Sequence, residues 1–278
     1  MKVQKHSGNI VDFDREKLKR SLLKSGAGTL AVDNVLQSIE QQLYDGITTK
    51  KIYKLAGKLL KRIAASHAAR YNLRSALQLL GPDGFFFEKF VARLFEYEGY
   101  QAMLNLNLQG HCVKHEIDIV IQKKQIITMI ECKFHNSNAV NSDVKVPMYI
   151  LSRFNDLKDS NHRLFSNHDK ISRCCIATNN RFTTDAIAFA SCMGIELLSW
   201  DYPKTSNLKS KIDLNGLYPI TCLTTLSSIE KEKLLILDIL LVRELIDDAD
   251  RLTKIGISPG RINNIIKEAH ALCNYNGS

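Results

Sequence analysis

Hydrophobic and polar positions divide the chain into three segments with different periodicity. Up to about residue 81, apolar residues recur at every third or fourth position, which is typical of amphipathic helices. From about residue 83 to residue 203, alternating runs and short apolar runs separate the helical stretches, and strands are expected there. After about residue 215 the helical spacing returns. We therefore expect a multidomain α+β chain with domains at 1–81, 83–203 and 215–278.

The first segment opens with two short strand-like runs around a Ser-Gly-Asn turn at 7–9, which predict a small β-hairpin. Asp14 suits the N-cap of the helix that follows. Three more helices are predicted, over 32–44, from Thr48 or Thr49 onwards, and over about 66–80, where Gly81-Pro82 ends the last one. This segment is therefore expected to be a helical bundle with a small hairpin.

The middle segment alternates helices with strands. The expected elements, in order, are a helix over 84–98, strands over 100–108, 115–121 and 126–133, a helix over 143–157, a strand over 172–178, a helix over 185–192 and a strand over 195–200. Pro147 is compatible with its helix if it lies in the first turn. Strands interleaved with helices favour a three-layer α/β/α arrangement.

The last segment is expected to be wholly helical. A long apolar helix is predicted over 229–246, with its pattern continuing to 255, and a final helix over 262–273. The Gly- and Pro-containing turn at 256–261 resembles a helix–hairpin–helix motif, which implies backbone N–H groups offered to a DNA phosphate. A structural pair of helices, or a dimer surface, remains an equal alternative.

Charged residues interrupt the two apolar strands at 115–121 and 126–133. Because strand side chains alternate between faces, Glu131 and Lys133 share one face of their strand. If the two strands form a hairpin, Asp118 comes close to Glu131. Carboxylate oxygens are the ligands that Mg²⁺ prefers, and a bound metal can activate water and stabilise charge on a phosphate. On the residues alone, a structural salt bridge on a half-exposed hairpin remains open.

The string Asp118…Glu131-Cys132-Lys133 resembles the PD-(D/E)xK nuclease superfamily, and specifically its Mrr-like restriction endonucleases, over about residues 83–200. The resemblance implies that Asp118, Glu131 and the backbone carbonyl of Cys132 hold Mg²⁺ or Mn²⁺, and that Lys133 positions the attacking water. The helix at 84–95 resembles the first helix of that group, which implies that Glu88 supports the metal site. Many members carry a glutamine early in the helix after the E-x-K strand, where this chain has lysine and valine at 145–146.

Three separated strings in the first segment resemble the ATP-cone domain of ribonucleotide reductases. They are Val3-x-Lys5-x-x-Gly8-x-x-x-x-Phe13-Asp14-x-x-Lys17, Asp45-Gly46-Ile47-Thr48-Thr49 and Ala69-Arg70-Tyr71-Asn72-Leu73. The resemblance implies that ATP or dATP binds beneath the hairpin. The residues that would line this nucleotide site are Val3, Lys5, His6, Phe13, Lys17, Thr49 and Tyr53. The family usually has an arginine at the position of His6.

The charge of the chain is concentrated in the first segment. Residues 1–81 hold 15 lysines and arginines against 6 aspartates and glutamates, and the two later segments are each balanced, so this segment accounts for the whole formal charge of +9. A cationic module of this kind favours a polyanionic partner, either nucleic acid or a nucleoside triphosphate. A solvated, lysine-rich helical surface is the alternative.

Cysteine usage and hydropathy indicate the compartment. The seven cysteines are scattered and include no C-x-x-C pair, which argues against a zinc ribbon and for reduced thiols. The N-terminus has no apolar signal core, and no apolar run reaches the length of a membrane span. A cytoplasmic protein that does not enter membranes is therefore expected.

Together, the resemblances imply a metal-dependent endonuclease of double-stranded DNA, regulated by ATP or dATP, that acts as a homo-oligomer in defence against foreign DNA. Two alternatives remain on the sequence. One is a non-catalytic, nucleotide-sensing DNA-binding regulator, and the other is a repair or junction nuclease with the same site chemistry. A ribonucleotide reductase is excluded, because its catalytic barrel does not fit into the residues after 81.

Overall fold

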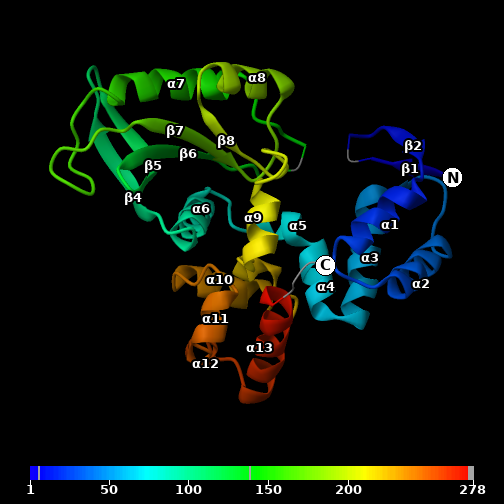
Figure 1. Ribbon diagram of the computed structural model, residues 1–278. Helices are drawn as coiled ribbons and strands as arrows, with labels where there is room; N and C mark the ends of the chain where they lie inside the picture. Colours follow the sequence, from blue (N-terminus) through cyan, green and yellow to red (C-terminus); the bar gives the residue numbers. More distant parts are fainter. Residues whose placement is uncertain (6, 138, 275–278) are drawn as a thin grey trace. The chain divides into compact units, whose positions relative to one another are not determined.

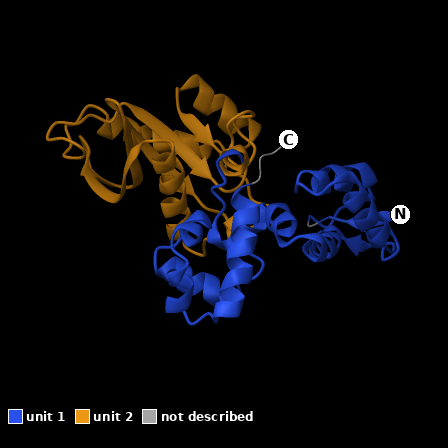
Figure 2. Ribbon diagram, turned by 60° about the horizontal axis from the view of Figure 1, so that its bottom comes forward, with its two compact units in different colours: residues 1–76, 214–278 blue, residues 77–213 orange. Residues whose placement is uncertain are grey.

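The computed structural model describes residues 1–5, 7–137 and 139–274, and Figure 1 shows its helices and strands. The chain divides into two compact units, one made of residues 1–76 and 214–278 and the other of residues 77–213 (Figure 2). Within these described ranges, no helix is both long and apolar enough to cross a membrane.

The N-terminal part of the first unit begins with the expected hairpin. Strand β1 (Lys2–Gln4) pairs antiparallel with β2 (Ile10–Asp12) and parallel with β3 (Ile47–Thr48). Helices α1 (Arg15–Leu23) and α2 (Thr29–Glu40) lie between β2 and β3 in the chain, and α3 (Thr49–Ile63) follows β3. As expected, Asp14 caps α1 by accepting a hydrogen bond from the N–H of Lys17, and Thr48 rather than Thr49 caps α3. Local polar side chains therefore fix where α1 and α3 start.

Two predicted helices of this part differ in the structure. The helix expected over 32–44 is α2, which starts and ends earlier, and residues 41–43 form turns after it. The helix expected over 66–80 is two helices, α4 (Ala65–Tyr71) and α5 (Leu73–Gln78), which break at Asn72. The break is stabilised by packing, because the Asn72 side chain lies against Gly57 of α3, where an added Cβ would stand 3.4 Å from the amide.

The C-terminal part of the first unit is helical. After α9 (Leu208–Asn215) and a 3₁₀ turn at Ile220–Cys222 come α10 (Ser228–Ile236), α11 (Arg243–Asp247), α12 (Asp250–Lys254) and α13 (Pro259–Cys273). The long helix predicted over 229–246 is therefore wrong. Asp238 has a φ of 60°, and the backbone beyond it bonds to a distant segment, because Ile220 N–H donates to Leu240 O and Val242 N–H donates to Tyr218 O.

Long-range contacts join the two ends of the chain within the first unit. The buried guanidinium of Arg70 in α4 donates to the carbonyl of Ala271 in α13 at 2.6 Å, and the Thr221 hydroxyl donates to the carbonyl of Ala76 at 2.7 Å. A cation near the C-terminus of a helix also interacts favourably with the helix dipole. These bonds explain why residues 1–76 and 214–278 form one compact unit.

The second unit is built on a mixed five-stranded sheet with the order β4-β5-β6-β7-β8. The strands are β4 (Gln101–Gln109), β5 (Lys114–Lys123), β6 (Ile126–Lys133), β7 (Arg173–Thr178) and β8 (Glu196–Leu198). The β4-β5-β6 pairs are antiparallel, and β6, β7 and β8 run parallel. The central strand β6 is buried on both faces, which its apolar residues allow.

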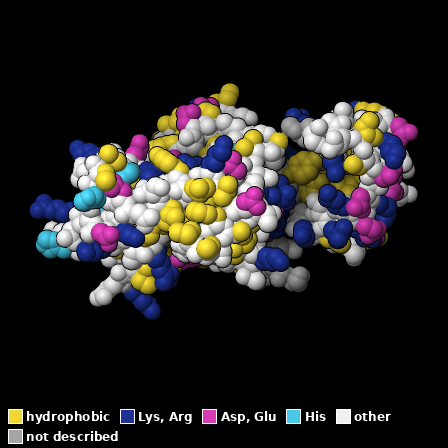
Figure 3. Space-filling model, turned by 90° about the horizontal axis from the view of Figure 1, so that it is seen from above, with side chains coloured by type: hydrophobic (Ala, Val, Ile, Leu, Met, Phe, Trp, Pro, Cys, Tyr) yellow, Lys and Arg dark blue, Asp and Glu magenta, His cyan; other side chains and the backbone are white. Residues whose placement is uncertain are grey.

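Helices cover both faces of this sheet, as expected for three layers (Figure 1). Helix α6 (Phe85–Tyr97) lies on one face, and α7 (Lys145–Leu157) and α8 (Thr184–Cys192) lie on the other. Pro147 is the third residue of α7, in the first turn as predicted. The outer face of α7 and α8 carries a gathering of hydrophobic side chains (Figure 3), and Met148 and Tyr149 of α7 are exposed.

Candidate active site

The charged residues of the middle segment meet where β5 and β6 lie side by side. The register pairs Ile119 with Ile130, so that Asp118 and Glu131 are the next facing positions of this antiparallel pair. The carboxylate of Asp118 accepts a hydrogen bond of 2.7 Å from the N–H of Cys132. Asp118 is thus held against β6 by its side chain, next to Glu131. The hairpin predicted from the sequence brings these two carboxylates together.

Glu131 is held by two cations, one from its own strand and one from a helix. Lys133 Nζ donates to Oε1 and Arg153 Nη1 of α7 donates to Oε2, each at 2.7 Å. The Glu131 side chain is only 6% exposed, whereas Lys133 is 32% exposed and so reaches solvent. Arg153 also donates to the carbonyl of Glu116 and lies over the ring of Tyr149. The Glu131 carboxylate is therefore nearly buried, and each of its oxygens accepts a hydrogen bond from a cation.

Glu88 reaches the same site from α6. The pKa of Glu88 is raised to about 7, first by burial and then by the charges of Asp118 and Glu131. The pKa of Asp118 is raised to about 6, first by burial and then by the charge of Glu131. Three carboxylates therefore crowd a poorly solvated region, with Lys133 as a partly exposed cation among them.

A glycine lets α6 start close to this region. Gly84, the N-cap of α6, has a φ of 86°, a backbone conformation that favours glycine. A Cβ at this position would stand 3.2 Å from Cβ of Phe134, the residue after Lys133. The close approach brings the first turn of α6, which carries Glu88, beside the end of β6.

The donor set suits a small hard cation. Mg²⁺ usually binds through one or two carboxylates, and waters and substrate phosphates complete its coordination. Asp118 and Glu131, with the backbone carbonyl of Cys132, would supply such a set, and a divalent charge would relieve the repulsion among the three carboxylates. Over 1–5, 7–137 and 139–274, no group of three or more His, Cys, Asp or Glu side chains is ready to hold a metal. Both oxygens of Glu131 are bonded to Lys133 and Arg153 instead.

Polar residues after β6 and β7 support the end of the E-x-K strand. The buried Asn179 accepts from the N–H of His135 and donates to its carbonyl, both at 2.9 Å. The Thr178 hydroxyl donates to the carbonyl of Lys133 at 2.6 Å. Sequence reasoning missed these residues and Arg153. The available signal was a run of polar residues, Thr178-Asn179-Asn180, directly after a buried strand that pairs with β6.

Two flanking residues have other roles in the structure. His115 bonds to Asp156 of α7 at 2.8 Å, outside the carboxylate cluster. Cys132 is a buried small residue, as expected, and burial raises the pKa of its thiol well above the ordinary value.

The residues predicted to line a nucleotide site divide into buried and exposed groups. Val3 is buried in the core beneath the hairpin, and Phe13 packs against that core. Lys5, Lys17 and Thr49 are exposed. Tyr53 stacks on Tyr71 with ring centroids 4.6 Å apart and donates its hydroxyl to the Tyr71 carbonyl at 2.6 Å, so it packs within the bundle. His6 lies outside the described residues.

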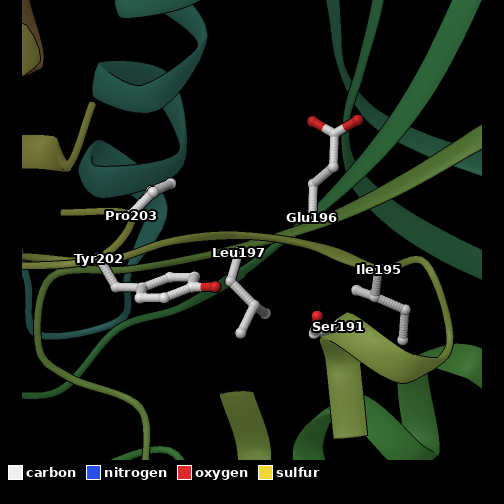
Figure 4. A pocket seen from close by; sticks show the side chains of 6 residues that line it. All are labelled: Ser191, Ile195, Glu196, Leu197, Tyr202 and Pro203. Atoms are coloured by element: carbon white, nitrogen blue, oxygen red, sulfur yellow. The ribbon is translucent and has the colours of Figure 1, made fainter. Parts of the chain in front are cut away.

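A depression elsewhere in the second unit contains none of these residues. It lies at the edge strand β8 and the end of α8 (Figure 4). Its lining consists of Ser191, Ile195, Glu196, Leu197, Tyr202 and Pro203. Because β7 separates β8 from β6, this depression is not part of the carboxylate cluster.

Comparison with protein families divides the chain into three matches. Residues 1–76 match the ATP cone domain, residues 79–202 match the restriction endonuclease catalytic domain of the Mrr type, and residues 218–273 match the AF1548-like C-terminal domain. The last match concerns the helical segment whose turn resembles a helix–hairpin–helix, and that motif stays a prediction.

The chain is also similar to individual known proteins. A protein of Archaeoglobus fulgidus without an assigned function is 33% identical over 183 residues, which cover 64% of this chain and 97% of that protein. The crystal structure of AF1548, a protein of unknown function, has a TM-score of 0.56 at 32% identity, over 68% of this chain and 97% of that one. Can2 from Sulfobacillus thermosulfidooxidans is much less similar, with a TM-score of 0.35 at 17% identity over 71% of this chain and 54% of Can2.

Proposed function

Because the chain belongs to the AF1548 family and joins an ATP cone to an Mrr-like restriction endonuclease domain, we propose that it is a metal-dependent endonuclease of double-stranded DNA whose activity responds to ATP or dATP. The observation that carries the proposal is that Asp118, from the middle of β5, lies beside Glu131 and Lys133 at the C-terminal end of β6. A defence role against foreign DNA, as a homo-oligomer, is the setting we propose.

Each residue would have a distinct task in hydrolysis. Asp118 and Glu131 would hold Mg²⁺ or Mn²⁺ with the Cys132 carbonyl, and Glu88 would be an outer ligand. The metal, when bound, supplies positive charge beside the scissile phosphate and favours deprotonation of water. Lys133 would orient the attacking water and offset the charge that develops on the phosphate. Attack in line with the leaving oxygen would break the phosphodiester bond and leave a 5′-phosphate.

Arg153 adds a positioning function to this scheme. It fixes one oxygen of Glu131 from α7, so that the carboxylate does not depend on Lys133 alone for its orientation. Lys133 is the more exposed of the two cations and is therefore free to turn toward a substrate phosphate. A nearly buried carboxylate with a fixed side chain is a preorganised ligand.

The ATP cone would act as a sensor. No Walker A string occurs in the chain, so nucleotide binding would shift a conformational equilibrium and not drive mechanical work. We propose that ATP or dATP binds at Lys5, His6, Lys17 and Thr49, beneath the hairpin. Its effect on cleavage is a coupling free energy, typically about 1–3 kcal/mol.

Substitution of Lys133 tests the proposal. We expect Lys133→Ala to reduce Mg²⁺-dependent nicking of supercoiled plasmid at least about 100-fold, because the variant lacks the cation beside the reacting phosphate. Nucleotide binding should stay intact, since the cone is a separate domain. Lys170→Ala, which removes an exposed lysine of the same unit, is the matched control and should cleave like the wild type. Equal cleavage by the two variants would contradict the role of Lys133.

A further inference from the structure

Helix α3 carries a dense set of cations and no acidic residue. Its sequence from Thr49 to Ile63 is TKKIYKLAGKLLKRI. The cations are Lys50, Lys51, Lys54, Lys58, Lys61 and Arg62, all exposed, and we call them the basic face. They provide six of the 15 lysines and arginines in residues 1–81. The positive charge of the N-terminal segment is therefore concentrated on one helix.

The helical geometry puts all six on one side. At about 100° per residue, positions 50, 51, 54, 58, 61 and 62 fall within an arc of about 120°. Ile52, Ala56 and Leu60 fall on the opposite side, and these three are buried in the core of the bundle. At about 1.5 Å per residue, the basic face extends about 18 Å from Lys50 to Arg62. It is a continuous band of positive charge on a helix whose opposite side is packed in the core.

The basic face has few internal partners. In the described ranges, no ion pair involves four of the six cations, Lys50, Lys54, Lys58 and Arg62. The other two have neutral partners. Lys51 donates to the Tyr44 hydroxyl at 3.2 Å, and Lys61 donates to the Thr224 carbonyl at 2.6 Å. Other cations of the N-terminal part do have carboxylate partners. Lys2 lies 2.9 Å from Asp12, Lys19 lies 2.8 Å from Asp33, and Arg15 lies 2.6 Å from Glu40.

Such an arrangement favours an extended anionic ligand. Like charges at i and i+4 repel and weaken a helix, and here Lys50, Lys54 and Lys58 follow that spacing. Double-stranded DNA offers about one negative charge per 1.7 Å of its length, a continuous row like the basic face, whereas a nucleoside triphosphate offers a single cluster. A membrane surface fits poorly, because the apolar side of α3 is packed in the core.

We infer that the basic face of α3 is a docking surface for the sugar-phosphate backbone of double-stranded DNA. The inference shares its ligand with the proposed function, but it requires neither cleavage nor a metal. Phosphate contacts of this kind hold DNA without reading its sequence. The surface would raise the local concentration of DNA for any site elsewhere on the chain.

Salt-dependent binding tests the surface. The full chain in EDTA is titrated with a fluorescent duplex of about 30 base pairs at several salt concentrations between about 50 and 200 mM. Lys54→Gln/Lys58→Gln should reduce the slope of log K against log salt by about 2, because each substituted lysine would otherwise neutralise one phosphate. Its affinity should fall at least about tenfold at ~100 mM salt.

Two control variants show whether the effect depends on where the charge is removed and on the loss of charge itself. Lys19→Gln/Lys24→Gln removes the same charge from the region of α1 in the same domain and should leave the slope unchanged. Lys54→Arg/Lys58→Arg keeps the charge on α3 and should bind like the wild type. Circular dichroism of each variant checks that it is folded.

The outcomes also distinguish failure of the DNA-docking surface from failure of the proposed nuclease activity. A slope that falls equally in both Gln variants, or a loss of ATP affinity without a loss of DNA affinity, would overturn the docking surface. Preference of the wild type for anionic vesicles or single-stranded RNA over the duplex would overturn it as well. A reduced slope in the α3 variant alone supports it, even if Mg²⁺ produces no cleavage, a result that would contradict only the proposed nuclease.

Discussion

At the scale of single residues, Glu131 is the most constrained group of the candidate site. Its side chain is almost wholly buried, and each carboxylate oxygen accepts a hydrogen bond from a cation, Lys133 or Arg153. A buried carboxylate is tolerated only when it is paired and hydrogen-bonded. Glu131 therefore links the geometry of the site to the stability of the second unit.

Removal of Arg153 tests this link. Arg153→Gln should destabilise the chain by about 3 kcal/mol, because a nearly buried carboxylate would lose one of its two cations. Urea unfolding of the metal-free protein measures the change. Arg173→Gln is the control, since its pair with Glu196 is more than half exposed and should contribute at most about 1 kcal/mol. The account is contradicted if the two substitutions have the same effect.

The sequence predicted Asp118, Glu131 and Lys133 as one cluster because all three lie in neighbouring strands joined by a short turn, where strand periodicity decides which side chains meet. It did not predict Arg153, which lies 22 residues beyond Glu131 on α7. That contact depends on how α7 packs against the sheet, which no local pattern specifies. Arg153 does occupy the buried side of its helix, near Ile150 and Leu157, where an arginine needs a partner.

At the scale of elements, local sequence signals located most helices and strands of the middle segment. In the first and last segments, contacts between residues far apart in sequence changed two of the predicted helices. The run 229–246 has good helical spacing, yet its backbone leaves the helix after Ile236. Leaving the helix lets the backbone of Leu240 and Val242 form hydrogen bonds with residues 218–220, which lie about 20 residues earlier in the sequence. Tertiary hydrogen bonds thus override the local propensity. Asn72 divides the helix expected over 66–80 for a similar reason, because it packs against α3.

Helix α10 and helix α13 are joined by an ion pair that makes a pH-dependent contribution to stability. Arg261 of α13 donates to Glu230 of α10, and Glu230 also completes a capping box with Ser227. The hydrogen bond with Arg261 lowers the pKa of Glu230 to about 2. Because the folded pKa is depressed from 4.5, the contribution is present above pH 4.5 and is lost as the pH falls toward 2.

Arg261→Gln tests this contribution. The variant should be slightly less stable than the wild type near neutral pH, and the effect should be small because Arg261 is exposed to solvent. The difference in unfolding free energy should shrink as the pH is lowered from 4.5 toward 2, because Glu230 becomes protonated in both proteins. Urea titrations across this range measure it. A difference that does not change with pH would mean that the ion pair contributes nothing to acid stability.

At the scale of the whole molecule, the chain combines a cationic ATP-cone module with a charge-balanced nuclease-like module. The exposed Lys5 and Lys17 are the cations that we assign to the nucleotide phosphates. Lysines act on phosphates as point charges, so their effect on binding is electrostatic. The basic face of α3 is a separate set of cations in the same module, for which we propose a different ligand.

A variant with both lysines replaced tests the sensor. Lys5→Ala/Lys17→Ala should weaken ATP binding at least about tenfold, which corresponds to ~1.4 kcal/mol. Isothermal calorimetry on the full chain measures the affinity. Lys19→Ala/Lys24→Ala removes the same charge from the region of α1 and should bind ATP like the wild type. If both variants bind ATP equally well, the nucleotide site does not involve Lys5 and Lys17.

The central claim is that the carboxylates on β5 and β6 support metal-dependent hydrolysis of DNA. The most direct measurement is the nicking of supercoiled plasmid by the purified full chain in Mg²⁺ and in EDTA, for the wild type and for Asp118→Asn. The account predicts nicking by the wild type in Mg²⁺ only, and a rate at least about 100-fold lower for Asp118→Asn. Plasmid left intact by the wild type with Mg²⁺ or Mn²⁺, with and without ATP, or cleaved equally fast by Asp118→Asn, would contradict it.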